Sequence, residues 1–112
     1  MKIEIISTPE FDKEYKRLKK KFRSLPHDLA DLEQALIEDP HLGVDLGGNF
    51  RKVRLAIKTK NKGKSGGGRV ITYFMLVNIF NAKIVLVFIY DKGEEQSISD
   101  SRIIEIINKF KD

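Results

Sequence analysis

Residues 51–69 carry eight lysines and arginines in nineteen positions and no acidic residue. The whole chain has a net charge of +5, so the residues outside this segment together carry −3. Positive charge gathered in one segment is typical of a surface that binds a polyanion, because its field attracts phosphate groups. The basic residues are Arg51, Lys52, Arg54, Lys58, Lys60, Lys62, Lys64 and Arg69.

Alternation within residues 51–58 divides this segment. In a strand, Val53 and Leu55 point to one face, and Lys52 and Arg54 to the other. If helices cover the apolar face, these two cations stand on the open face of a sheet, and Arg69, which opens the next strand, could pair nearby across the hairpin. Fixed cations on a sheet face suit a phosphate, although antiparallel sheets also expose lysine and arginine for solubility alone.

The connection at residues 59–68 is polar and rich in glycine, and it has no apolar anchor. It lacks the spacing of a nucleotide-binding P-loop, and a strand follows it where that motif needs a helix. One interpretation is a flexible basic loop that follows a nucleic-acid backbone, and the other is a loop that contacts an acidic partner protein. Its RNA-binding candidates are Lys58, Lys60, Lys62 and Lys64.

A second group of reactive side chains ends the last predicted strand. Tyr90, Lys92 and Glu94 bring a phenol, an amine and a carboxylate together, which are groups used in acid–base chemistry. Charge runs at strand ends are also commonly only solvated. His27 and His41 lie far apart and the chain has no cysteine, so no metal site is predicted.

Two helices are predicted between a first strand at residues 2–7 and a glycine-rich loop at residues 41–49. The first helix begins after Thr8, whose hydroxyl can cap it, and keeps its apolar side chains on one face as far as Phe22. The second ends at Asp39, because the residue before a proline is pushed out of the helical region. Together they predict a helical hairpin.

Alternating or β-branched runs predict three further strands at residues 51–58, 69–78 and 83–91. An amphipathic helix follows, with a capping-box pattern at residues 97–100. The order β-α-α-β-β-β-α predicts one α+β domain spanning the chain, with a largely antiparallel four-stranded sheet. We expect the helical hairpin on one face of this sheet and a C-terminal helix after it.

No stretch of the chain approaches the roughly 20 apolar residues that a membrane-spanning helix needs. The N-terminus has an acidic residue at position 4 and lacks the apolar core of a secretory signal. These features predict a cytoplasmic protein that has no membrane partner.

Three segments carry a resemblance to a known family. They are Arg51-Lys52-Val53-Arg54-Leu55, then Lys-Gly-Lys-Ser-Gly-Gly-Gly-Arg-Val-Ile at residues 62–71, and Tyr-x-Lys-x-Glu at residues 90–94. They resemble the RelE/ParE toxin superfamily, and the glycine-rich segment is particularly similar to its HigB-like branch. The predicted order of helices and strands matches as well, so the resemblance covers essentially the whole chain.

This resemblance implies the toxin of a type II toxin–antitoxin system, an endoribonuclease that cuts mRNA in the A site of the 70S ribosome. It implies no metal or other cofactor, and a partner antitoxin that usually contains a helix-turn-helix DNA-binding module. The implied reaction is attack of a ribose 2′-hydroxyl on the adjacent phosphate. That reaction needs a base, cations for the developing charge and an acid for the leaving oxygen.

The resemblance also suggests which side chains do this chemistry. RelE has another arginine and a stacking tyrosine after the last strand, whereas this chain has Glu94 and Glu95 there. The assignment of base and acid therefore stays open. The candidate catalytic residues are Lys52, Arg54, Arg69, Tyr90, Lys92 and Glu94.

Two other functions fit the same pattern. A ParE-like member would act on DNA gyrase through protein contacts and would not cleave RNA. A non-catalytic module would bind RNA or the ribosome in a salt-dependent way.

Overall fold

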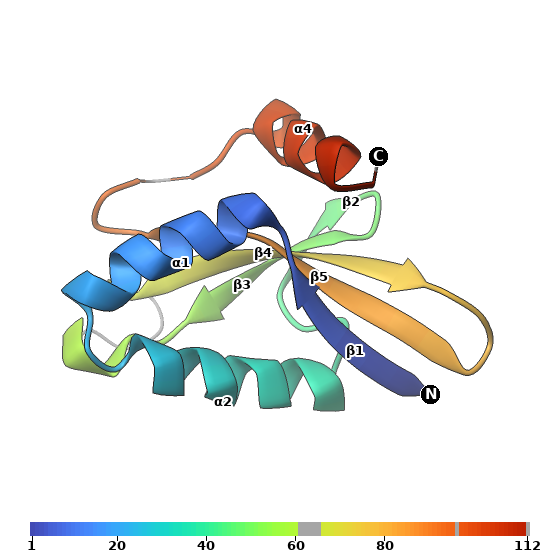
Figure 1. Cartoon of the computed structure of the whole chain (residues 1–112), viewed down its shortest axis with the longest axis horizontal. Coiled ribbons are helices and arrows are strands. Elements are labelled where there is room, and N and C mark those ends of the chain that lie inside the picture. The colour runs from blue at the N-terminus through green and yellow to red at the C-terminus, as the bar shows by residue number, and fades with distance from the viewer. Residues whose placement is uncertain (61–65, 96, 112) are drawn as a thin grey trace.

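A five-stranded mixed sheet forms the centre of the fold (Figure 1). The computed structural model describes residues 1–60, 66–95 and 97–111. The strands lie side by side in the order β1-β5-β4-β3-β2, so the last strand of the chain is an inner strand of the sheet. Their bounds are β1 Lys2–Ser7, β2 Val44–Gly47, β3 Phe50–Leu55, β4 Gly68–Leu76 and β5 Asn81–Asp91.

The structure confirms the α+β class but corrects the predicted sheet in two respects. First, β1 pairs with β5 in parallel, from Lys2 opposite Asn81 to Ser7 opposite Leu86. Alternation identified β1 as a strand but says nothing about its neighbour or direction. Second, the segment predicted as a glycine-rich loop contains β2, which pairs with β3 in an antiparallel manner.

The helices begin and end close to the predicted positions. The backbone N–H of Phe11 donates to the hydroxyl of Thr8 at 3.0 Å, which confirms the first cap. The last helix begins at Asp100, later than predicted, and Arg102 N–H donates to the hydroxyl of Ser99 at 3.2 Å. None of the helices in the described ranges is both long and apolar enough to cross a membrane. The bounds of the α-helices are α1 Pro9–Lys21, α2 Leu25–Glu38 and α4 Asp100–Lys111.

Helices cover both faces of the sheet. On one face, α1 and α2 bury Val53 and Leu55 of β3, while on the other α4 packs over Ile71 and Val85. Figure 1 shows α2 and α4 on opposite sides of the sheet. Because β5 is covered from both sides, its sequence is a nearly continuous apolar run rather than an alternating one. The face that carries Lys52 and Arg54 is therefore partly covered, rather than open throughout.

Candidate functional site

A row of three side chains crosses three strands on the α4 side of the sheet. The register places Arg54 of β3 opposite Arg69 of β4, and Arg69 opposite Tyr90 of β5. Directly opposite residues on neighbouring strands project from the same face and lie about 5 Å apart. Lys52 projects from this face one pleat further along β3, opposite Ile71. We call Arg54, Arg69 and Tyr90 the cross-strand row.

The alternation of side chains along β3 explains why Lys52 and Arg54 project from the same face. Val53 and Leu55 are buried against the helical hairpin, while Arg54 is exposed and Lys52 is half-buried on the other face. The direct pairing with Arg69 follows from the antiparallel register of β3 and β4. The structure thus places Arg54 of β3 directly beside Arg69 of β4.

Access to solvent changes along the row. Arg54 is exposed, whereas Arg69 is only 6% exposed and Tyr90 only 2%. The Nη1 of Arg69 donates to the backbone oxygen of Gly68 at 2.9 Å. A polyanion therefore meets the row first at Arg54.

The phenol of Tyr90 is the buried end of the row. Its hydroxyl has no hydrogen-bond partner among the described residues. Burial raises the pKa of Tyr90. The positive charge of Arg69 lowers this pKa and the negative charge of Glu95 raises it, but burial is the largest cause and the net shift is upward. The hydroxyl therefore keeps its proton at neutral pH, which suits an acid rather than a base.

A pocket of about 270 Å³ lies beside the exposed end of the row. Arg54 and Lys58 line it together with Asp28 and Asp31 of α2, and apolar side chains complete the wall. The Oδ2 of Asp28 accepts hydrogen bonds from the hydroxyl of Ser24 at 2.6 Å and from the N–H of Lys58 at 3.2 Å. These bonds hold Lys58, in the middle of the basic segment, against α2.

Part of the predicted RNA-binding loop is ordered secondary structure. Lys58 and Lys60 lie in the 3-10 helix η1, Lys58–Lys60. Lys58 is exposed and forms an ion pair of 3.6 Å with Asp31. The side chain of Lys60 is only 11% exposed and forms an ion pair with Asp91, so it does not face solvent as an RNA-binding cation would. The predicted loop residues Lys62 and Lys64 lie outside the described residues.

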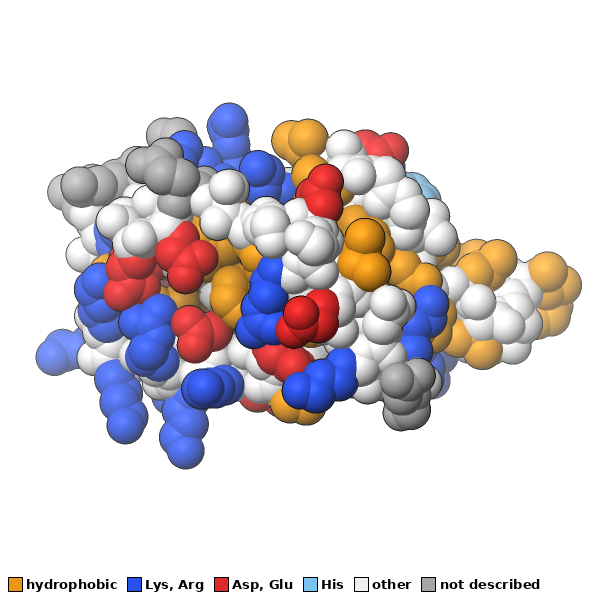
Figure 2. All heavy atoms as spheres, turned by 90° about the horizontal axis from the view of Figure 1, so that it is seen from above, with side chains coloured by type: hydrophobic (Ala, Val, Ile, Leu, Met, Phe, Trp, Pro, Cys, Tyr) orange, Lys and Arg blue, Asp and Glu red, His pale blue; other side chains and the backbone are white. Residues whose placement is uncertain are grey.

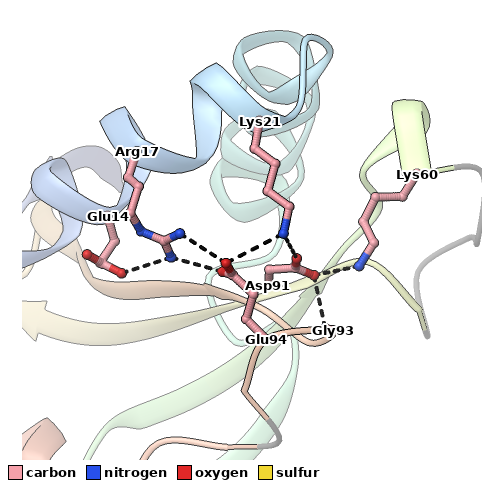
Figure 3. A network of polar contacts seen from close by, with 7 residues as sticks. All are labelled: Glu14, Arg17, Lys21, Lys60, Asp91, Gly93 and Glu94. Atoms are coloured by element: carbon pink, nitrogen blue, oxygen red, sulfur yellow. Dashed lines mark hydrogen bonds and ion pairs between the residues drawn. The ribbon is translucent and has the colours of Figure 1, made fainter.

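Asp91 is the main polar residue that the sequence prediction missed (Figure 3). It is 2% exposed, and its carboxylate accepts hydrogen bonds from Lys60, from Lys21 at 3.3 Å and from the N–H of Gly93 at 3.0 Å. Burial alone would raise the pKa of Asp91, but these hydrogen bonds outweigh it and lower the pKa. Alternation along β5 could have indicated this role, because the residue after Tyr90 projects from the opposite face of the strand. That face lies toward the lysine-rich end of α1.

Glu94 belongs with these α1 contacts and not with the cross-strand row. Its carboxylate accepts two hydrogen bonds from Arg17, at 2.9 and 3.0 Å, and one from Lys21 at 3.5 Å (Figure 3). The hydrogen bond from Arg17 is the main cause of its lowered pKa. Lys92 is exposed, and its backbone N–H donates to the oxygen of Gly67 at 3.1 Å. Of the Tyr90–Glu94 run, the structure thus joins only Tyr90 to the predicted cations.

The described residues contain no group of three or more histidine, aspartate and glutamate side chains that could hold a metal ion. The chain matches no protein-family model, and a comparison with curated proteins finds no match to its sequence.

Proposed function

We propose that the chain is the toxin of a type II toxin–antitoxin system, a RelE/ParE-like and specifically HigB-like endoribonuclease that cleaves mRNA on the ribosome. The observation that carries the proposal is the cross-strand row. Two arginines and a protonated phenol stand in direct register on one sheet face. This set supplies two of the three functions that the reaction needs, cations for the phosphate and an acid for the leaving group.

The reaction begins when the ribose 2′-oxygen attacks the adjacent phosphorus and gives up its proton. Charge then develops on the non-bridging oxygens, where Arg54 and Arg69 can donate charged hydrogen bonds. The bond from phosphorus to the 5′-oxygen breaks, leaving a 2′,3′-cyclic phosphate and a 5′-hydroxyl. Lys52, which projects from the same face as the row, is the candidate for the base that takes the 2′-hydroxyl proton.

Tyr90 is our candidate for the acid that protonates the 5′-oxygen. Its proton is retained at neutral pH, and its hydroxyl is not committed to another group among the described residues. Glu94 is a poor base by comparison, because Arg17 and Lys21 hold its carboxylate and lower its pKa. We therefore leave Glu94 out of the reaction.

The burial of Arg69 and Tyr90 favours a second function, a non-catalytic module that binds RNA or the ribosome. In that case the exposed cations, Arg54 and Lys58, carry the interaction through phosphate contacts alone. Binding would weaken steeply with salt and would leave the RNA intact.

The proposed function is tested by inducing the chain briefly and sequencing RNA 5′ ends, with and without a block in translation. Cleavage is expected within translated mRNAs, with cyclic phosphate and 5′-hydroxyl ends, and it should vanish when translation is blocked. Replacing both Lys52 and Arg54 by Ala should relieve growth arrest while the fold persists. Arg23→Ala is the matched control, because Arg23 is exposed at the turn between α1 and α2.

Each rival gives a different result in this experiment. DNA damage without shortened mRNAs would replace the proposal with a ParE-like gyrase inhibitor. Salt-dependent RNA binding without new ends would replace it with the non-catalytic module. Full toxicity of the Lys52 and Arg54 double variant would show that the site lies elsewhere.

A further inference from the structure

Helix α1 carries a second concentration of positive charge, separate from residues 51–69. Residues 13–21 contain six lysines and arginines and one acidic residue. Together the two segments hold 14 of the chain's 21 lysines and arginines but only one of its 16 acidic residues. Figure 2 shows lysine and arginine side chains projecting from the end of the molecule away from its apolar tip. The function proposed above uses only one of these two segments.

Two of the α1 cations are neutralised by carboxylates. Arg17 and Lys21 point toward the end of β5, where the carboxylates of Asp91 and Glu94 bind them (Figure 3). The ion pairs measure 2.9 Å from Arg17 to Glu94 and 3.3 Å from Lys21 to Asp91. These two cations therefore hold the fold together and offer little charge to a partner.

Three other lysines of α1 have no such partners. Lys13, Lys16 and Lys20 are exposed, and within the described ranges their ammonium groups form no ion pair. Spacings of three and four residues place them on one face of the helix, along about 10 Å of its axis. The opposite face buries Phe11 and Leu18 in the core, so the charge of the three lysines is directed to solvent. We call Lys13, Lys16 and Lys20 the α1 stripe.

Other anionic partners fit the α1 stripe less well than a nucleic acid does. A lipid surface takes up apolar side chains beside the cations, and the apolar side of α1 faces the core. Protein interfaces are depleted in lysine and enriched in aromatic residues. The one aromatic residue of this segment is Tyr15, whose half-buried ring stacks on Phe11 at 6.1 Å and lies under the ammonium of Lys19 at 5.9 Å. A single strand, which stacks its bases on exposed rings, therefore finds none on this segment.

We propose that the α1 stripe binds the phosphate backbone of double-stranded RNA. Lysines on a helix that is held by its buried face keep their spacing, so they can contact neighbouring phosphates together. A duplex presents phosphates every few ångströms along its length, and a stripe of about 10 Å reaches about three of them. Like charges at these spacings repel one another on the bare helix, and bound phosphates remove that repulsion.

The α1 stripe and the cross-strand row lie on different sides of the chain. Helix α1 covers the face of the sheet that buries Val53 and Leu55, whereas the row lies on the α4 side. A structured RNA held by the stripe therefore leaves the row free for the strand that is cleaved. The choice of RNA over DNA rests on the proposed function, since a chain that acts on the ribosome meets RNA duplexes. The contact with phosphates itself does not depend on cleavage.

Fluorescence anisotropy with a labelled RNA duplex of about 16 base pairs tests this proposal, from about 50 mM to about 200 mM salt. Replacing Lys13, Lys16 and Lys20 together by Gln should weaken binding about tenfold or more. It should also lower the slope of log K against log salt by about 2–3, because three phosphate contacts are lost. Gln has a helix propensity close to that of Lys, so α1 should persist, and circular dichroism checks this.

The matched control replaces Lys2, Lys83 and Lys111 together by Gln. It removes the same charge from β1, β5 and the end of α4 and leaves α1 unchanged. Binding should change by less than about threefold, because the effect of distant charges is screened at these salt concentrations.

Duplex binding that the triple variant leaves unchanged would overturn the proposal, as would a loss of the same size in the control. No binding at about 50 mM salt would also overturn it and leave the stripe as a solvated face. Tighter binding to a DNA duplex of the same sequence would overturn the choice of RNA. A chain that binds the duplex through the stripe but leaves mRNA intact would refute the proposed function and not this one, and mRNA cleavage without duplex binding would do the reverse.

Discussion

Tyr90 and Asp91 are neighbours in sequence at the end of β5, and each is 2% exposed, yet their surroundings are opposite. The hydroxyl of Tyr90 has no hydrogen-bond partner among the described residues, and its pKa is raised. Both oxygens of Asp91 accept hydrogen bonds, and its pKa is lowered. Two adjacent residues thus differ in whether their polar groups are satisfied.

The difference arises because alternate residues of a strand face different parts of the molecule. Asp91 lies on the side of the sheet that the helical hairpin covers. There it binds Lys21 from α1 and Lys60 from η1, so it joins three segments that are far apart in the chain. Tyr90 lies on the other side, beside Arg69. A buried polar group without a partner costs about 1–3 kcal/mol, a cost that the hydroxyl of Tyr90 shares with the Oδ1 of Asp28. Asp91 thus links distant segments of the fold, whereas Tyr90 is the candidate acid of the proposed reaction.

The largest expected effect is on activity. Tyr90→Phe removes the proposed acid and should reduce RNA cleavage by about 10²- to 10⁴-fold. The free energy of unfolding should stay the same or rise slightly, because the lost hydroxyl was buried without a partner. Cleavage of a translated mRNA and urea unfolding measure the two effects.

Tyr73→Phe is the control for this prediction. Tyr73 projects from the same face, and its hydroxyl accepts a hydrogen bond from Lys111 at 3.2 Å. That variant should retain cleavage. If Tyr90→Phe cleaves as fast as the unmodified chain, the proposed division between the two residues fails.

Asp91→Ala should produce the largest loss of stability. It leaves the ammonium of Lys60, which is 11% exposed, without its carboxylate. Removing one member of a buried ion pair costs about 3–5 kcal/mol. Urea unfolding measures this cost, and the double variant Asp91→Ala with Lys60→Met should recover part of it. A double variant no more stable than Asp91→Ala would contradict this account.

The stability should also fall in acid because of Asp91. Its pKa is lower in the folded chain than the value near 3.9 of an unfolded aspartate. Its contribution is therefore complete above about pH 4 and is lost as the pH falls through the folded pKa. Unfolding followed from about pH 6 down to about pH 2 should show this loss, and Asp91→Asn should give a flatter curve. Parallel curves would assign the acid sensitivity to other carboxylates.

Much of the cross-strand row could be predicted from the sequence. Alternation predicted that Lys52 and Arg54 share a face, and a strand that opens at Arg69 could bring this residue close to them across a hairpin. Exposure could not be predicted in the same way. Tyr90 is buried in the cluster that α4 forms over the face expected to be open, and Arg69 on the neighbouring strand is buried as well.

The parallel β1–β5 pair, β2 and the role of Asp91 were beyond sequence reasoning for a common reason. Each depends on contacts between distant segments, such as Asp91 with Lys21 and Lys60. Periodicity shows which face a residue occupies but not which element lies opposite. A carboxylate in a charged run at a strand end therefore resembles a solvated residue until its partners are known.

Glu94→Gln should have the smallest effect. It tests most directly whether the ion pairs on the Asp91 side of β5 are separate from the reaction proposed on the Tyr90 side. Glu94 is 32% exposed and its partner Arg17 is 48% exposed, so the lost ion pairs should cost at most about 1 kcal/mol, and less at high salt. Urea unfolding at low and high salt measures this cost, with Glu105→Gln, which breaks the more exposed pair with Arg102, as the control. Cleavage should persist, because Arg17 and Lys21 bind Glu94 away from the row. A loss of cleavage without a loss of stability would instead make Glu94 the base, and the reaction would then draw on both sides of β5.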